Sequence, residues 1–243
     1  MDEMISKLRD YISNSNNIVF FGGAGVSTES GIPDFRSTDG LFNARYKHPP
    51  EVMLSYSFFM SHTSEFFQFY RDRMIYTSAK PNAAHIALAE MERMGKLKAV
   101  ITQNIDGLHQ AAGSTNVIEL HGSVHRNYCM DCNASYELEF ILRTEDIPRC
   151  TCGGIVKPDV VLYEEGLDDA AIHDSIRYIS MADMLIIGGT SLLVYPAAGL
   201  IRYFVGDKLV VINKGKTHVD RSADLAIDGN ISAVLNEACL GLA

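Results

Sequence analysis

The chain has 243 residues, and 21 Lys and Arg against 30 Asp and Glu give it a formal net charge of −9. Because sequence-independent nucleic-acid binding depends on basic side chains that neutralise phosphates, this charge argues against such a partner. Hydrophobic residues make up 47% of the chain, but no apolar run approaches the roughly 20 residues that cross a bilayer. The first residues lack the basic and apolar regions of a secretory signal, so we expect a cytoplasmic protein without membrane contact.

Buried parallel strands are predicted where a short apolar run without alternation ends in glycine or a polar residue. Helical periodicity fills the intervals between most of these runs, and this alternation predicts a doubly wound α/β sheet. The predicted strands are residues 18–21, 99–102, 117–120, 184–189, 209–213 and 225–227, and the predicted helices are residues 1–16, 83–94, 167–181 and 197–204.

Two stretches depart from this alternation. One is rich in Met, Phe and Tyr at helical spacing and the other holds a cysteine cluster, so we interpret them as insertions that form a smaller module beside the sheet. The predicted division is 1–40, 77–124 and 157–243 for the large domain, 41–76 for the helical insertion and 125–156 for the cysteine-rich insertion.

A glycine-rich loop follows the first predicted strand. Glycines such as Gly22 and Gly25 let backbone N–H groups approach a pyrophosphate at a helix N-terminus. The dinucleotide fingerprint requires a third glycine where this chain has Thr28, and an acidic residue about 20 positions later that this chain lacks. The loop alone fits an ordinary glycine turn equally well. The next segment, residues 31–36, adds a carboxylate, an aromatic ring and a guanidinium, which favours a ligand site.

Polar side chains cluster after the second predicted strand, in residues 102–109. In α/β folds ligands bind at the carboxyl ends of strands, so Gln103, Asn104 and Asp106 are candidates to contact a polar small molecule. Helix capping is the structural alternative, and it explains one of these side chains more easily than all three.

His121 ends the next short apolar run. With an ordinary pKa of about 6.5, a histidine here is a candidate general base. A lone histidine is more often structural, and that is our interpretation of the other seven.

Four of the five cysteines form two close pairs separated by 17 residues. Thiolates in this arrangement suit one tetrahedral zinc ion, and a complete set of four predicts a structural site. The alternative, a redox-active pair, is disfavoured because all four fit one site. The predicted ligands are Cys129, Cys132, Cys150 and Cys152.

An edge strand is predicted at residues 157–163, because Pro158 cannot donate in a ladder and β-branched residues follow it. Such an edge can accept a substrate backbone as an added strand. A plain connecting strand remains the alternative.

Together these motifs resemble the sirtuin family of NAD-dependent protein deacylases, in a short bacterial or archaeal form. The resemblance spans nearly the whole chain and implies a Rossmann-like domain joined to a small zinc-ribbon and helical module, with NAD as co-substrate and one structural Zn²⁺. NAD and an acyl-lysine protein or peptide are expected to enter the cleft between the two from opposite sides. The motifs are residues 23–27, 31–36, 102–109, 121–122 and 189–192, with the four cysteines.

The resemblance also implies roles for individual residues. His121 is expected to be the catalytic base, with Asn104 as a second catalytic residue. The pyrophosphate is expected at Ala24, Gly25 and Thr28, the loop over the nicotinamide ribose at Phe35 and Arg36, the nicotinamide pocket at Gln103, Asn104, Ile105 and Asp106, and the adenosine half at Thr190, Ser191, Asn213 and Ile231. Further expected NAD contacts are Gly22, Asp34 and Gly189, and the expected substrate contacts are Val160, Val161, Leu162 and Tyr163.

The implied reaction consumes NAD. Nicotinamide leaves as the acyl oxygen attacks the ribose, and His121 then helps a ribose hydroxyl attack the alkylamidate that results. Water releases lysine and O-acyl-ADP-ribose. Since no hydride moves, the departure from the dehydrogenase fingerprint is accounted for.

Two places call for comment within this resemblance. Glu164 stands where family members commonly carry the glycine of Phe-Gly-Glu, so we expect an altered hold on the peptide backbone. Tyr70 and Arg73 match the Tyr-x-x-Arg pair of sirtuins that remove succinyl and malonyl groups, whose arginine would suit an acyl carboxylate. We interpret Arg73 as solvated and keep desuccinylation as a hypothesis.

Three other functions are alternatives to the deacylase. A mono-ADP-ribosyltransferase also cleaves nicotinamide from NAD but passes ADP-ribose to a protein side chain. A zinc-ribbon interaction module on an inactive NAD-sensing fold would need His121 or Asn104 to be dispensable, and the complete polar set disfavours it. An NAD dehydrogenase is disfavoured by Thr28 and the missing ribose acid.

Overall fold

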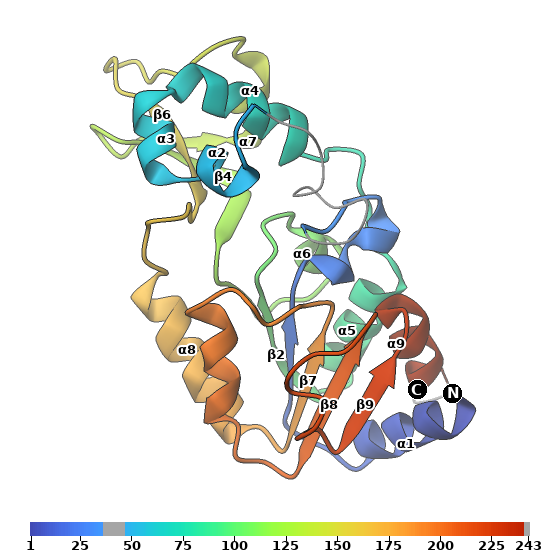
Figure 1. The fold of residues 1–243 in the computed structure, drawn as a ribbon. Helices are drawn as coiled ribbons and strands as arrows, with labels where there is room; N and C mark the ends of the chain where they lie inside the picture. Colours follow the sequence, from blue (N-terminus) through green and yellow to red (C-terminus); the bar gives the residue numbers. More distant parts are fainter. Residues whose placement is uncertain (36–46, 241–243) are drawn as a thin grey trace.

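The computed structural model describes residues 1–35 and 47–240. In this part of the chain, six parallel strands form the larger sheet, in the order β3-β2-β1-β7-β8-β9 (Figure 1). Counted along the chain within this sheet the order is 3-2-1-4-5-6, the Rossmann arrangement, whose switch point lies between β1 and β7. The strands are β1 (Ile18–Gly22), β2 (Leu97–Thr102), β3 (Val117–Glu119), β7 (Met184–Gly188), β8 (Lys208–Asn213) and β9 (Leu225–Asp228).

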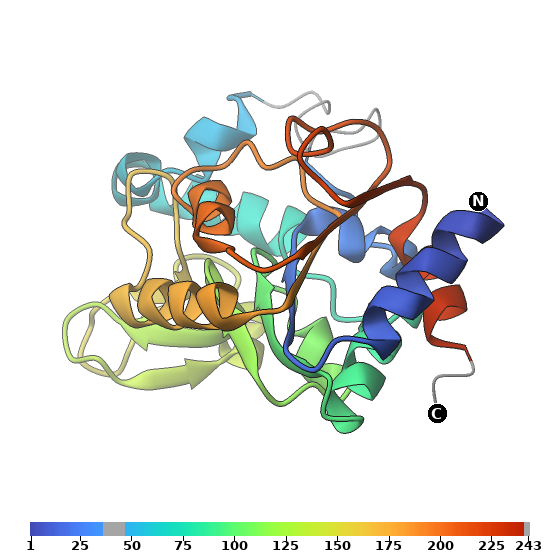
Figure 2. The same cartoon turned by 90° about the horizontal axis from the view of Figure 1, so that it is seen from below.

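The apolar runs are buried on both faces of this sheet, as predicted. Because side chains alternate across a strand, Phe20 packs into a core with α1, α5 and α9, whereas Phe21 packs into a core with α8 and η4 on the other face (Figures 1 and 2). The covering helices are α1 (Asp2–Ser13), α5 (Ala83–Arg93), α8 (Asp169–Met181), α9 (Ile231–Cys239) and the 3-10 helix η4 (Ala197–Tyr203).

The doubly wound α/β fold is therefore confirmed, although one of the covering helices differs in type. The helix predicted at residues 197–204 is a 3-10 helix, begun by Pro196 and ended by extended backbone at Phe204. No helix of the described residues is long and apolar enough to cross a membrane.

A smaller antiparallel sheet, in the order β5-β4-β6, lies at the other end of the molecule (Figure 1). Its edge strand β6 contains Pro158, in agreement with the predicted edge. The strands are β4 (Gly122–Cys129), β5 (Ser135–Glu137) and β6 (Val156–Val160), and the neighbouring helices are α2 (Pro50–Met53), α3 (Tyr56–Ser61), α4 (Thr63–Arg73) and α7 (Leu138–Arg143).

An aromatic core joins these helices to the small sheet. Phe59 of α3 meets Phe66 of α4 edge to face at 4.9 Å, and Phe66 stacks on Tyr70 at 5.6 Å. Residues of both predicted insertions contribute to this core. Strands β4 and β6 continue past the boundaries drawn at 125 and 156, and the division into domains stays a prediction.

Gly122 begins β4 at a point where the chain passes very close to β6. Its φ is +74°, and a Cβ there would lie 1.8 Å from the carbonyl oxygen of Asp159. Only glycine allows this approach, which fixes the backbone directly after His121.

Replacing Gly122 by alanine should lower the free energy of unfolding by about 2 to 4 kcal/mol, because strained backbone and a clash with a carbonyl add together. Urea unfolding measures the effect. Gly113→Ala is the matched control, since Gly113 also has positive φ (+105°) but nothing within 4 Å of the added Cβ. Equal losses in the two variants would show that the clash contributes nothing.

Candidate active site

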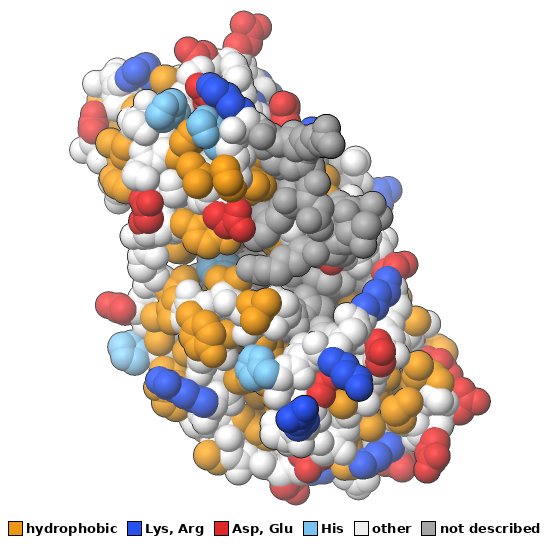
Figure 3. Space-filling model, in the orientation of Figure 1, with side chains coloured by type: hydrophobic (Ala, Val, Ile, Leu, Met, Phe, Trp, Pro, Cys, Tyr) orange, Lys and Arg blue, Asp and Glu red, His pale blue; other side chains and the backbone are white. Residues whose placement is uncertain are grey.

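A cavity of about 1250 Å³ lies between the carboxyl edge of the large sheet and the small sheet with its helices. In Figure 3 hydrophobic side chains border the hollow between the upper and lower parts of the molecule. Gly22 is not among the lining residues, and Arg36 lies outside the described residues. The predicted NAD and substrate contacts that line the cavity are Ala24, Gly25, Thr28, Asp34, Phe35, Gln103, Asn104, Ile105, Asp106, His121, Val160, Val161, Leu162, Tyr163, Gly189, Thr190, Ser191, Asn213 and Ile231.

The glycine loop after β1 lies against the loop after β7. The backbone N–H of Gly25 donates to the carbonyl of Gly189 at 2.8 Å, and a Cβ on Gly25 would lie 2.8 Å from the Cα of Gly189. The two loops meet at the switch point, where side chains of any size would hold them apart. Backbone of the first loop thus forms part of the cavity wall.

The helix expected after this loop does not form as an α-helix. Two 3-10 turns follow β1 instead, η1 (Ala24–Val26) and η2 (Thr28–Ser30), and the second ends at Gly31 in the left-handed conformation. Thr28, in the place of the third fingerprint glycine, donates from Oγ1 to the carbonyl of Gly25 at 3.1 Å. This bond closes the turn. An anion bound at this loop would therefore contact the ends of short 3-10 turns and not the end of an α-helix.

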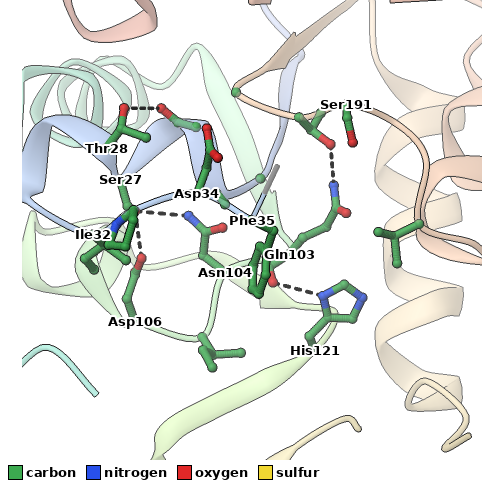
Figure 4. A pocket seen from close by; sticks show the side chains of 18 of the residues that line it. Ser27, Thr28, Ile32, Asp34, Phe35, Gln103, Asn104, Asp106, His121 and Ser191 are labelled. Atoms are coloured by element: carbon green, nitrogen blue, oxygen red, sulfur yellow. Dashed lines mark hydrogen bonds between the residues drawn. The ribbon is translucent and has the colours of Figure 1, made fainter. Parts of the chain in front are cut away.

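Ser27, Asn104 and Asp106 form a hydrogen-bonded cluster in the cavity wall (Figure 4). The hydroxyl of Ser27 donates to Asp106 at 2.7 Å and accepts from the Nδ2 of Asn104 at 3.0 Å. The second carboxylate oxygen of Asp106 accepts from the N–H of Leu108 at 2.9 Å, at the start of α6 (Leu108–Ala111). Asp106 therefore makes a local turn contact just before α6, while also lining the cavity.

Ser27 was absent from the predicted site residues. It stands in the glycine loop, and its importance comes from contacts with residues 77 and 79 positions away. A hydroxyl directly after the glycines was the available signal, although serine is common in turns.

Gln103 connects three parts of the site. Its side-chain Nε2 donates to the hydroxyl of Thr190 at 3.0 Å, and its backbone N–H donates to the carbonyl of Gly22 at 3.0 Å. Its own carbonyl lies 2.9 Å from the Nδ1 of His121 (Figure 4). One residue at the end of β2 thus links β1, the loop after β7 and the histidine.

The protonation of His121 follows from this last contact. A carbonyl oxygen only accepts, so Nδ1 carries the proton and Nε2 keeps its lone pair. Burial lowers the pKa of His121 below the ordinary 6.5, and the hydrogen bond to Gln103 offsets part of that effect. At neutral pH the ring is therefore neutral and can accept a proton at Nε2.

Two other histidines are buried away from the cavity lining. The rings of His85 and His109 are 4.7 Å apart, and burial is the main cause that lowers their pKa values to about 4 and about 3. The Nδ1 of His85 accepts from the N–H of Asn82, which precedes α5. Both rings are neutral parts of the core, in agreement with a structural role.

The far end of the cavity contains an unsatisfied donor. Asn213, at the end of β8, accepts from the N–H of Thr190 at 3.0 Å through Oδ1, while its buried Nδ2 has no hydrogen-bond partner among the described residues. An unpaired buried donor costs about 1–3 kcal/mol, so it is suited to an acceptor on a bound molecule. This donor fits the predicted adenosine half of NAD.

The four clustered cysteines fit one zinc ion. Their sulfur atoms all lie within 4.8 Å of one another, and Cys129–Cys152 and Cys132–Cys150 are 3.5 Å apart. Tetrahedral Zn–S bonds of about 2.3 Å place sulfurs about 3.8 Å apart, close to this arrangement. None of the four is in a disulfide. With four ligands from the chain the site would be structural.

Tyr70 and Arg73 do not both line the cavity. Tyr70 is fully buried in the aromatic core and does not line the cavity, whereas Arg73 does line it. A tyrosine hydroxyl at this position is therefore not directed into the cavity with the arginine.

Comparison with known proteins decides the family. A model of the Sir2 family matches residues 23–196. The chain belongs to the Sir2 family. An NAD-dependent protein deacetylase from Clostridium acetobutylicum is 62% identical over 237 residues, covering 96% of this chain and 97% of its own. Another from Clostridium perfringens is 63% identical over 241 residues, covering 98% and 99%.

Solved Sir2 structures share the whole architecture. One Sir2 enzyme has a TM-score of 0.91 at 41% identity, with 100% of this chain and 98% of the other covered. A second, Sir2 with 2′-O-acetyl-ADP-ribose, a deacetylated p53 peptide and an inhibitor, has a TM-score of 0.86 at 37% identity, covering 98% and 100%. The sirtuin resemblance read from the sequence is confirmed.

Removing zinc should lower the free energy of unfolding by roughly 3 kcal/mol or more, because the turns that carry the cysteines lose the metal ion that joins them. Metal analysis and urea unfolding check this, with about one zinc per chain expected before chelation. Cys150→Ser should lose the metal, while Cys239→Ser, outside the cluster, should retain it. Full zinc content in the Cys150 variant would contradict the four-cysteine site.

Proposed function

We propose how the cavity residues of this NAD-dependent protein deacetylase divide the work. The observation that carries the proposal is the neutral His121, held at Nδ1 by Gln103, with Nε2 available in the cavity. NAD, the co-substrate, supplies a ribose carbon that becomes open to attack when nicotinamide leaves. The chain supplies binding, orientation and one proton acceptor.

The NAD contacts would lie along the carboxyl edge of the large sheet. Backbone of Ala24 and Gly25, with Thr28, would hold the pyrophosphate, and Asn213 with its unpaired Nδ2 would hold the adenosine half. The further contacts would be Gly22, Asp34, Phe35, Arg36, Gln103, Asn104, Ile105, Asp106, Gly189, Thr190, Ser191 and Ile231.

The cluster of Ser27, Asn104 and Asp106 would orient the nicotinamide ribose. Because one N–H of Nδ2 in Asn104 donates to Ser27, the carbonyl Oδ1 and the second N–H of Nδ2 are left for a ligand. We assign Asn104 a catalytic role and Ser27 a positioning role, since the serine fixes both the asparagine and the aspartate.

His121 would act as general base. It accepts a proton at Nε2 from a hydroxyl of the bound co-substrate, and the bond from Nδ1–H to Gln103 stabilises the charged ring that results. With NAD and the peptide bound between the two sheets, bulk water would be excluded from this proton transfer.

The acyl-lysine peptide would lie along residues 160–163, beyond the edge strand β6. The N–H of Val161 donates to the carbonyl of His121 at 3.0 Å, so this segment is attached to the catalytic residue. Among the described residues the carbonyl of Val161 has no hydrogen-bond partner, and it is available to an added strand. The contacts would be Val160, Val161, Leu162 and Tyr163.

We further propose acetyl over succinyl groups as the preferred substrate, because buried Tyr70 does not join Arg73 at the cavity. The partners would be acyl-lysine proteins or peptides, with nicotinamide as product, and we propose a cytoplasmic location, where reduced thiols suit the zinc ligands.

Nicotinamide release tests these roles. With acetyl-lysine peptide, the wild type should release nicotinamide and free lysine, and His121→Ala should lose roughly 10²–10⁴-fold in rate, the usual contribution of a general base. His173→Ala, at an exposed histidine of α8 that does not line the cavity, is the control and should react as the wild type. Succinyl peptide should react more slowly.

Two outcomes would contradict the proposal. Release without peptide, accompanied by ADP-ribose on protein, would favour the transferase. Zinc and NAD binding without any release would favour the sensing module.

Deacetylation should keep its rate as the pH falls to about 6.5, the ordinary pKa of histidine, and should lose rate only at lower pH. Because burial lowers the pKa of His121, the ring stays neutral through that value, and protonation of Nε2 at lower pH removes the base. The measurement is kcat/KM between about pH 5 and 8, with a thermal melt at each pH to monitor the fold. A rate that rises on acidification would rule out the neutral His121.

A further inference from the structure

Glu164 adopts a backbone conformation that favours glycine. Its φ is +77°, in the left-handed region, and it directly follows the segment 160–163. Residues with a Cβ adopt this conformation at an energetic cost, so something in the surroundings has to hold Glu164 there.

The carboxylate of Glu164 provides that hold. One oxygen accepts from the backbone N–H of Ser57 at 2.8 Å, and the other accepts from the Ser57 hydroxyl at 3.0 Å. Both contacts join residues 107 positions apart, from β6 and its extension to helix α3. The glutamate is therefore bound at both oxygens to a single residue.

Backbone hydrogen bonds beside Glu164 reinforce the same junction. The N–H of Tyr163 donates to the carbonyl of Leu54 at 2.9 Å, and the N–H of Tyr56 donates to the carbonyl of Tyr163 at 3.0 Å. The outer end of the segment is thus fastened to the helices, while its inner end is hydrogen-bonded through Val161 to the carbonyl of His121.

We propose that Glu164 is a positioning residue for the peptide substrate. By fixing the outer end of residues 160–163 to Ser57, it presents their backbone to the acyl-lysine chain at a set distance from His121. Glu164 itself lines the cavity mouth next to this segment. The inference rests on the proposed peptide site at residues 160–163, and it concerns binding of peptide, not chemistry at His121.

Geometry, more than charge, is what this role requires. A glutamine keeps one acceptor for the N–H of Ser57, and its amide can donate to the serine hydroxyl, which both donates and accepts. Alanine loses both contacts and retains the strained φ. Glycine loses both contacts and removes the strain. Comparing it with alanine therefore separates the effect of the two contacts with Ser57 from the effect of the strained backbone.

Steady-state kinetics with acetyl-lysine peptide and NAD test the proposal. Glu164→Ala and Glu164→Gly should raise KM for the peptide about fivefold, the net worth of about one hydrogen bond, and leave kcat and KM for NAD at wild-type values. Glu164→Gln should restore the peptide KM. Glu51→Ala, an exposed glutamate of α2, is the matched charge control and should behave as wild type.

A double-mutant cycle identifies the partner. Ser57→Ala should raise the peptide KM less than Glu164→Ala, because the backbone N–H remains, and the combined variant should be no worse than Glu164→Ala alone. Additive effects would show that the two residues act separately and would overturn the proposed role of the contacts between Glu164 and Ser57.

Two further results would overturn the inference while leaving the deacetylase intact. One is an unchanged peptide KM in Glu164→Gly. The other is a lower kcat, a higher KM for NAD and a lower melting temperature in the same variant, which would show that Glu164 has a structural role only. If the wild type itself showed no peptide-dependent release, the proposed substrate site would fail first, and this inference with it.

Discussion

The close contact between Gly25 and Gly189 is the constraint on which the site depends. The two loops leave adjacent strands of the sheet, β1 and β7, at the switch point, and a hydrogen bond of 2.8 Å joins their backbones. A side chain at Gly25 would meet backbone atoms of Gly189 within 3 Å. Because the two loops are in contact, the backbone of both lies in the cavity wall, and residues at the polar ends of β2 and β8 line the same cavity.

Gln103 connects these two loops to His121. Its side chain bonds the loop after β7 through Thr190, and its carbonyl fixes the proton on Nδ1 of His121. The same residue therefore holds the loop after β7 and selects the histidine tautomer that leaves Nε2 basic. Burial acts in the same direction by keeping the ring neutral.

The larger sheet could be predicted from the sequence because each buried strand is a continuous apolar run, and parallel pairing then requires helices between strands. The cavity lining was predictable where motifs lie at strand ends, as at His121 and Gln103. Ser27 was missed because its bonds to Asn104 and Asp106 arise only when distant strands meet. The 3-10 turns after β1 were missed for a different reason, since the Thr28 hydroxyl closes the turn on the carbonyl of Gly25 through a local contact that apolar periodicity does not record.

The small sheet and its helices have a different source of order. The large sheet is held by its own ladder, but residues 50–76 are held by aromatic packing, and the cysteine turns have short strands and few apolar residues of their own. A four-sulfur site supplies what such turns lack, because one ion replaces many apolar contacts. Residues 160–163, the proposed substrate segment, are hydrogen-bonded to both parts, because Tyr163 and the adjoining Glu164 contact α3 and Val161 contacts His121. A change in how the small sheet sits against the large one would therefore move these residues relative to His121, so the proposed reaction depends on the order of the small sheet and its helices.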